Sequence, residues 1–213
     1  MQIQIALDRM PSDAALMCAR SVAPLVDWIE VGTSLVKRYG AGFIREITDA
    51  AGDTPVLADL KTADDARWEF CMAYDSGARS ATVLGLASAA TIDTAIAVAA
   101  ERGLEVVIDL MGLDEHQREQ LARRTPASVV LAAHVGKDSQ GTDAGPLAQL
   151  GAWADGRRVA LAGGLGAADL PGLAGRDIRV IIGSAVTGSA DPVAAVEALL
   201  EAAGRPAPTV GRR

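Results

Sequence analysis

The sequence predicts a closed (β/α)₈ barrel formed as one domain by residues 1–203. Short apolar runs recur at intervals of about 25 residues, and segments with helical periodicity separate them. Only 2 Phe, 2 Tyr and 3 Trp occur, so Ala, Val, Leu and Ile must build the core. That composition suits a parallel sheet covered by helices. Eight such units in 213 residues fit the compact end of the barrel size range.

The predicted strands are short and largely continuous in hydrophobicity. Continuous apolar runs indicate strands that are buried on both faces. The eight runs are 3–7, 26–31, 55–60, 80–84, 104–110, 128–133, 158–162 and 178–182.

Capping signals mark several helix boundaries. The first helix is expected to open at Ser12 or Asp13, and Asp114 with Gln117 forms a capping box. Asp191-Pro192 supplies an N-cap followed by proline at the first helical position. The glycines expected to close helices are Gly77, Gly103 and Gly175.

The main alternative fold is an open doubly wound sheet. It usually carries fewer strands at this length, and no G-x-G-x-x-G follows the first strand. The barrel is therefore favoured. Residues 204–213 lack apolar periodicity and are predicted to be a disordered tail.

Charge, cysteine content and the lack of a long apolar run indicate which partners and which cellular compartment to expect. A net charge of −7 argues against nucleic acid or an anionic membrane as the main partner. Cys18 and Cys71 lie in apolar helical stretches and are expected to be buried, reduced thiols. The chain starts directly in a strand and has no apolar run long enough to span a bilayer, so we expect a cytoplasmic protein.

Polar side chains end five of the predicted strands. In a (β/α)₈ barrel the carboxyl ends of all strands meet at one rim, where catalytic groups lie. A single such residue, for example Asp8 or Asp109, has an ordinary reading as a turn residue or loop cap, but five coinciding strand ends favour a site. The residues are Asp8, Glu30, Asp59 with Lys61, Asp109 and His134, from the first, second, third, fifth and sixth strands.

Four carboxylates and one lysine at one rim would repel one another without a further cation. A hard divalent ion such as Mg²⁺, bound by the oxygens of Glu30 and Asp59, is the natural candidate.

Asp64 and His134 each have two competing interpretations, whereas His116 has one. Asp64 either takes part in the site or caps the third helix, with Asp65 as a second candidate cap. His116 lies in a charged helix and is expected at the surface. His134 stands where an apolar strand breaks into a loop, so it is either catalytic or a structural histidine.

Two glycine-containing loops are suited to a phosphate group. Glycine lets backbone amides approach an anion, and the loops after the seventh and eighth strands of this fold recurrently bind phosphate. The expected phosphate-binding residues are Gly163, Gly164, Gly183 and Ser184.

Together these segments resemble the 3-hexulose-6-phosphate synthases, a family of the orotidine 5′-monophosphate decarboxylase suprafamily. The resemblance runs from Ile3 to about Ala203. Its motifs are Ala6-Leu-Asp8, Ile29-Glu30-Val-Gly-Thr33, Ala58-Asp59-Leu-Lys61-Thr-Ala-Asp64, Thr82-Val-Leu-Gly85, His134-Val-Gly-Lys-Asp138, Ala162-Gly-Gly164 and Thr187-Gly-Ser-Ala-Asp-Pro192.

The nearest sibling family, 3-keto-L-gulonate-6-phosphate decarboxylase, shares the Asp-x-Lys-x-x-Asp cluster. The segments 82–85 and 134–138 favour the synthase, since the decarboxylase carries an arginine at Lys137 or a neighbour. Ser184 replaces a glycine usual in the synthases, and Asp65 and Trp68 are bulkier than their usual counterparts. Trp68 is expected near a subunit interface, where it would reshape the site.

The resemblance implies an aldehyde-lyase that condenses formaldehyde with D-ribulose 5-phosphate to D-arabino-3-hexulose 6-phosphate, reversibly, through a 1,2-enediolate. It implies Mg²⁺, with Mn²⁺ as the alternative, at Glu30 and Asp59. Lys61 would donate to the enediolate and His134 would remove the C1 proton. Asp8 and Asp109 would orient Lys61 and the substrate hydroxyls. In this family the residue matching Asp64 enters the partner's site, which implies a homodimer.

Three alternatives remain open from the sequence. The decarboxylase would form the same enediolate by losing CO₂. A pentulose-phosphate epimerase would need acid/base groups on both faces of the substrate, and the sequence offers one good histidine. A non-catalytic phosphosugar-binding barrel would need only the phosphate loops.

Overall fold

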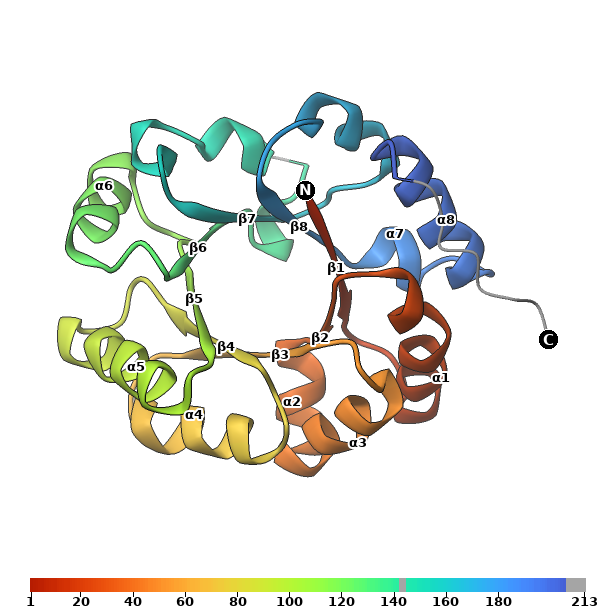
Figure 1. Ribbon diagram of the computed structural model, residues 1–213, viewed down its shortest axis with the longest axis horizontal. Coiled ribbons are helices and arrows are strands. Elements are labelled where there is room, and N and C mark those ends of the chain that lie inside the picture. The colour runs from red at the N-terminus through yellow and green to blue at the C-terminus, as the bar shows by residue number, and fades with distance from the viewer. Residues whose placement is uncertain (142–144, 206–213) are drawn as a thin grey trace.

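The computed structural model describes residues 1–141 and 145–205 and shows a closed barrel of eight parallel strands in the order β1 to β8 (Figure 1). The predicted fold class is confirmed, and the open sheet is excluded. The strands are β1 (Gln2–Leu7), β2 (Trp28–Val31), β3 (Val56–Thr62), β4 (Ser80–Leu84), β5 (Glu105–Asp109), β6 (Val130–His134), β7 (Arg158–Ala162) and β8 (Ile178–Ile182).

Helices surround the strands as an outer ring (Figure 1). They are α1 (Ser12–Val22), α2 (Thr33–Tyr39), α3 (Ala41–Ala51), α4 (Ala66–Asp75), α5 (Ala89–Arg102), α6 (Glu115–Arg124), α7 (Ser184–Thr187) and α8 (Pro192–Ala202). The described parts of the connections after β6 and β7 contain only 3₁₀ segments: Lys137–Ser139, Pro146–Gln149, Ala152–Ala154 and Ala167–Leu173. Glycines and prolines interrupt these connections and disfavour a continuous α-helix.

Two of the three predicted helix N-caps, Asp114 and Asp191, are confirmed by side-chain hydrogen bonds. Asp114 and Gln117 form the reciprocal capping box of α6, and Asp191 Oδ1 accepts from the amide of Ala194 at 3.0 Å. The first helix begins at Ser12, but its N-cap is Pro11, without a side-chain hydrogen bond. Of the three predicted closing glycines, Gly103 is a left-handed C-cap of α5. Gly77 and Gly175 also have positive φ and follow α4 and the 167–173 segment.

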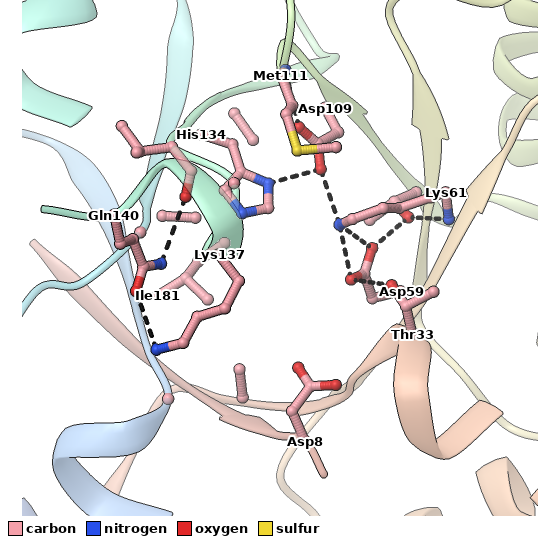
Figure 2. Close-up of a pocket in the computed structure, with 18 of the residues that line it drawn as sticks. Asp8, Thr33, Asp59, Lys61, Asp109, Met111, His134, Lys137, Gln140 and Ile181 are labelled. Atoms are coloured by element: carbon pink, nitrogen blue, oxygen red, sulfur yellow. Dashed lines mark hydrogen bonds and ion pairs between the residues drawn. The ribbon is translucent and has the colours of Figure 1, made fainter. Parts of the chain in front are cut away.

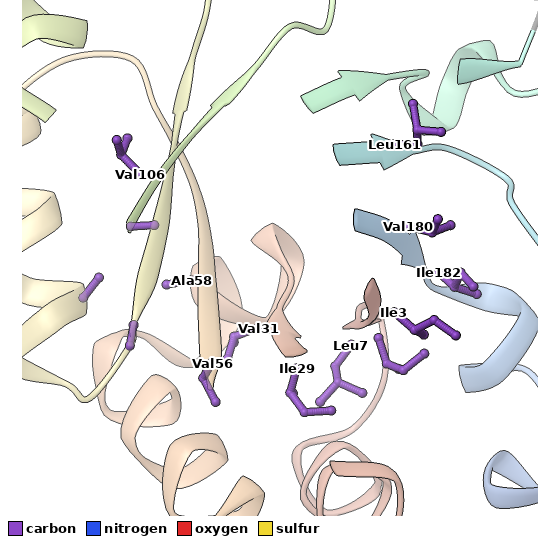
Figure 3. Packing of buried hydrophobic residues seen from close by; sticks show 14 of the residues in the cluster. Ile3, Leu7, Ile29, Val31, Val56, Ala58, Val106, Leu161, Val180 and Ile182 are labelled. Carbon is purple, nitrogen blue, oxygen red and sulfur yellow. The ribbon is translucent and has the colours of Figure 1, made fainter. Parts of the chain in front are cut away.

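The core has two parts. The larger lies between barrel and helices, where Ile3, Leu7 and Ile29 point outward from β1 and β2 (Figure 3). A smaller cluster fills the barrel interior with Leu57, Val107, Val130, Ala132 and Ala160. Aliphatic residues of modest size therefore fill both layers, as the composition predicts.

Both cysteines are free. Cys18 is buried, and burial raises the pKa of its thiol; Cys71 is only half-buried, which departs from the prediction. Gly204 and Arg205 begin the predicted tail, and Arg205 forms an ion pair with Asp27. The rest of that tail, residues 206–213, lies outside the described residues. Within the described ranges, no helix is long and apolar enough to cross a membrane.

Candidate active site

A cavity of about 940 Å³ opens at the carboxyl ends of the strands. It includes the predicted strand-end residues Asp8, Glu30, Asp59, Lys61, Asp109 and His134, together with Gly163, Gly164, Gly183 and Ser184. The structure thus brings together every predicted site residue except Asp64. Figure 2 shows several of these side chains facing the same space.

Lys61 lies between two buried carboxylates. Its Nζ donates to Asp59 Oδ2 at 2.8 Å and Oδ1 at 3.0 Å, and to Asp109 Oδ2 at 2.9 Å. Burial by itself lowers the pKa of Lys61, but the charges of Asp59 and Asp109 outweigh burial and raise this pKa above its usual range. The ammonium is therefore held in its charged form at neutral pH.

The backbone around Lys61 departs from a regular strand. The β3–β4 register shifts between Ala58 and Thr62, and Lys61 has a left-handed φ of 48°. Its amide leaves the regular ladder and donates to Thr82 Oγ1 at 2.8 Å. Bulges re-aim side chains, and a left-handed backbone is unfavourable for a non-glycine residue. Strand β3 therefore carries a strained backbone at Lys61, the residue whose ammonium contacts both carboxylates.

Asp109 joins Lys61 to His134. Its Oδ2 meets His134 Nδ1 at 2.8 Å as well as Lys61 Nζ, and its Oδ1 accepts from the amide of Met111 at 3.0 Å. Burial tends to raise the pKa of Asp109, but His134 and Lys61 reverse that effect and hold the pKa well below its usual range. An ionised Asp109 accepts a hydrogen bond from Nδ1–H and leaves Nε2 of His134 as the basic nitrogen.

Glu30 is buried beside Asp59. Burial, and then the charge of Asp59, raises the pKa of Glu30 to about 8. Gln4 Nε2 donates to its Oε2 at 2.6 Å. The charge of Lys61 acts in the opposite direction but does not outweigh these two effects, so without a further cation Glu30 favours its protonated form.

The donor set of Glu30 and Asp59 fits a hard divalent cation, because both supply carboxylate oxygens from adjacent strands. Asp59 already accepts from Thr33 at 2.6 Å and from Thr82 at 2.8 Å, besides Lys61. Among the described residues, no group of three His, Cys, Asp or Glu is arranged to hold a metal. Water or substrate oxygens would have to complete the shell, as is usual for Mg²⁺.

Asp8 does not orient Lys61, contrary to the expectation from the resemblance. Its Oδ1 accepts from Ser34 Oγ at 2.6 Å and from the Ser34 amide at 3.2 Å, in the first turn of α2. Figure 2 shows its carboxylate across the cavity from Lys61. The Ser34 hydroxyl, and a first-turn amide of α2 that has no partner within the helix, attract this carboxylate. Asp109 alone fulfils the predicted orienting contact with Lys61.

Asp64 lies outside the cavity, exposed on the loop between β3 and α4. Helix α4 begins after Asp65, which has a left-handed φ of 51° and forms no side-chain cap. Within the part of the chain that the structure describes, Asp64 has no hydrogen-bonding partner either. The helix-cap interpretation of both residues is therefore wrong. His116 is exposed on α6, as predicted, and contacts Gln120.

The two glycine loops border one side of the cavity. Gly163 and Gly164 have φ values of 118° and 73°, and a Cβ at Gly163 would lie 2.5 Å from the Val135 carbonyl oxygen. Only glycine fits there. Within the described residues, the amides of Gly163, Gly164 and Ser184 donate to no protein acceptor. Free amides turned to a cavity suit an anionic group.

Thr33, Thr82 and Gln4 were not identified as site residues from the sequence. Both threonines stand in quoted motifs, but hydroxyls are common at strand ends and carry no signal of their own. Gln4 had a usable signal, because a glutamine inside the apolar run 3–7 is a buried polar group that needs partners.

Comparison with known proteins identifies relatives across the whole chain. Residues 1–199 match the model of the orotidine 5′-phosphate decarboxylase / HUMPS family. The 3-hexulose-6-phosphate synthase of Mycobacterium gastri is 36% identical over 203 residues, covering 93% of this chain and 98% of that protein.

Solved structures agree with these sequences. The 3-hexulose-6-phosphate synthase of Salmonella typhimurium superposes with a TM-score of 0.88 at 32% identity, covering 95% of this chain and 98% of that one. The 3-keto-L-gulonate-6-phosphate decarboxylase of Vibrio cholerae has a TM-score of 0.81 at 26% identity, covering 97% of this chain and 99% of that one. Relatives of this kind are catalytic lyases, which removes the alternative of a non-catalytic barrel.

Proposed function

The chain belongs to the orotidine 5′-phosphate decarboxylase / HUMPS family and is a lyase of the 3-hexulose-6-phosphate synthase type, and on this premise we propose its reaction and mechanism. It condenses formaldehyde with D-ribulose 5-phosphate to D-arabino-3-hexulose 6-phosphate, and catalyses the reverse. The observation that carries the proposal is the single Asp109 oxygen that binds both Lys61 Nζ and His134 Nδ1.

Proton transfer falls to His134. Its Nε2 removes the proton from C1 of the ketose, and Asp109 stabilises the imidazolium that results. The electron pair of the broken C1–H bond gives a 1,2-enediolate, whose C1 attacks the carbon of formaldehyde. As the C=O bond re-forms at C2, the new C–C bond forms and the formaldehyde C=O π electrons move to oxygen. That oxygen takes the proton held on His134 Nε2, which returns His134 to its basic form.

Lys61 stabilises the charge that develops on the enediolate. Its ammonium is already fixed by Asp59 and Asp109, so little reorganisation is needed when the anion forms. Mg²⁺, or Mn²⁺, held by Glu30 and Asp59 would add Lewis-acid charge at the enediolate oxygens. The raised pKa of Glu30 supports this placement, since a cation there would relieve the repulsion with Asp59.

The remaining residues bind and position substrate. The free amides of Gly163, Gly164 and Ser184, with Gly183 beside them, hold the phosphate, and Asp8, at the end of the neighbouring strand β1, also faces the substrate. Ser184 is exposed and adds a hydroxyl where the resembling synthases tend to carry glycine.

Asp64 acts in a second copy of the chain, in a homodimer. Its exposed position outside the cavity of its own chain supports this assignment. Trp68 on the adjoining helix is 72% exposed, which is unusual for an indole side chain and suits a contact surface.

The second candidate is 3-keto-L-gulonate 6-phosphate decarboxylation, supported by the structural likeness to the Vibrio cholerae decarboxylase. Purified enzyme with Mg²⁺ is incubated with ribulose 5-phosphate and formaldehyde, and separately with 3-keto-L-gulonate 6-phosphate. We expect formaldehyde consumption to dominate, and addition of EDTA to stop it. Faster CO₂ release from the gulonate, with little formaldehyde consumed, supports the decarboxylase instead.

A further inference from the structure

A column of polar side chains runs down the barrel interior from the cavity to the opposite end. Gln4 on β1 stands in its middle and is 0% exposed. The strand register places Ala6 opposite Glu30 and Gln4 opposite Trp28, so Gln4 lies one layer below Glu30. Gln2 pairs with Arg179 one layer further down. Gln4 therefore connects Glu30 to the base of the barrel.

Arg179 anchors the lower end of the column. It is 3% exposed, donates to Glu105 at 2.8 and 3.0 Å, and lies 4.1 Å from the ring centroid of Trp28. Its remaining contacts reach Gln2 at 3.3 Å and Gln4 Oε1 at 3.4 Å. Ion pair and aromatic ring together fix the guanidinium in place.

The fixed guanidinium determines how the Gln4 amide is turned. Arginine is only a donor, so the Gln4 oxygen must face Arg179 and its NH₂ group must face Glu30. That arrangement gives the 2.6 Å bond from Gln4 Nε2 to Glu30 Oε2. Gln4 is the one described residue that hydrogen-bonds the Glu30 side chain, and Glu30 Oε1 keeps its lone pairs.

We propose that Gln4 is a positioning residue that holds the Glu30 carboxylate with one oxygen bound and the other presented to a divalent cation. The inference rests on the proposed function, in which Glu30 is a metal ligand. Without Gln4 the buried carboxylate would lose its partner and its fixed orientation. Hydrogen-bonding partners of metal ligands commonly change metal affinity by about 10- to 100-fold.

Metal binding without substrate tests the proposal. Wild type, Gln4→Met and Gln2→Met are stripped with EDTA and titrated with Mn²⁺, with free Mn²⁺ followed by electron paramagnetic resonance. Gln4→Met is expected to raise the Kd for Mn²⁺ about 10- to 100-fold. The matched control, Gln2→Met, also removes a contact to Arg179 but none to Glu30, and its Kd stays within about twofold of wild type.

Two other results contradict the role of Gln4, and a third contradicts the proposed metal itself. Equal Mn²⁺ affinity in wild type and Gln4→Met overturns the role of Gln4 and leaves the proposed function intact. Equal weakening in both variants assigns the effect to the barrel base and also overturns it. Wild type that binds no Mn²⁺ or Mg²⁺ overturns the metal in the proposed function, and this inference with it. Gln4→Asn, whose amide is too short to span both partners, replaces Gln4→Met if that variant does not fold, with the same expected loss.

Discussion

The carboxylate of Asp8 occupies the space that a side chain at Gly32 would need: a Cβ on residue 32 would lie 2.2 Å from Cγ and Oδ2 of Asp8. The carboxylate of Asp8 can rest against the first turn of α2 only because residue 32 has no side chain. The relationship links a backbone position on the β2–α2 loop to a charged group in the cavity.

Gly32→Ala should displace Asp8 and break its two contacts with Ser34. We expect a loss of about 1–3 kcal/mol in the free energy of unfolding and a clear fall in kcat/KM. Urea unfolding and the aldol assay measure the two effects. Gly42→Ala, inside α3 with open space around it, is the control and should be neutral or stabilising. Equal behaviour of the two variants would show that Asp8 moves freely.

Lys61→Ala should abolish turnover while the barrel still folds. The change removes the ammonium that faces the enediolate, so kcat/KM should fall about 10³-fold or more. Steady-state kinetics measure the loss, and circular dichroism checks the fold. Near-wild-type turnover in a folded variant would remove Lys61 from the mechanism.

Asp109→Asn should inactivate His134 by reversing its tautomer. The Asn amide donates to Nδ1, so the proton moves to Nε2 and the base is lost; we expect kcat to fall about 10²- to 10⁴-fold. Exchange of the C1 proton of ribulose 5-phosphate in D₂O, without formaldehyde, should fall in parallel. Asp114→Asn keeps a good N-cap on α6 and serves as the control. Unchanged exchange in Asp109→Asn would assign the base elsewhere.

The ion pair of Glu105 with Arg179 should make stability depend on pH. Burial tends to raise the pKa of Glu105, but Arg179, with Arg158, outweighs it and holds the pKa below its usual range. A depressed carboxyl pKa contributes stability above the unfolded value of about 4.3, and this is lost as pH falls through the folded value.

Glu105→Gln should therefore lose about 3 kcal/mol at pH 7 and progressively less below about pH 4. Thermal unfolding of both proteins from about pH 3 to about pH 8, on either side of the ordinary carboxyl pKa, checks this. A constant difference at every pH would mean that the charge of Glu105 contributes nothing.

Asp64→Asn tests the contribution across a dimer interface. Activity should be lost while the dimer and the melting temperature are retained, because Asp64 caps no helix in its own chain. Sedimentation and kinetics on the same sample decide the point. Mixing Asp64→Asn with Lys61→Ala chains should restore part of the activity, since a mixed dimer contains one complete site.

The sequence predicted the strands closely because burial on both faces leaves uninterrupted apolar runs. The bounds of 80–84, 158–162 and 178–182 agree with β4, β7 and β8. The same principle placed Glu30, Asp59, Lys61, Asp109 and His134 around one cavity, because parallel strands end at one rim.

The contacts among those residues could not be predicted in the same way. The shared Asp109 oxygen depends on side-chain rotamers and on the bulge in β3, and neither leaves a periodic signal. The resemblance implies that Asp8 helps to orient Lys61, but the nearby Ser34 hydroxyl binds Asp8 instead. The 3₁₀ connections after β6 and β7 departed from the repeating pattern through their Gly and Pro content.

The left-handed backbone of Lys61 sets a trade-off between stability and function. A φ of 48° suits glycine better than lysine, so Lys61→Gly would relieve backbone strain while deleting the ammonium. Selection for stability alone would favour that exchange, and selection for turnover opposes it. Efforts to make this barrel more thermostable should therefore leave position 61 untouched and seek their gains on the helices.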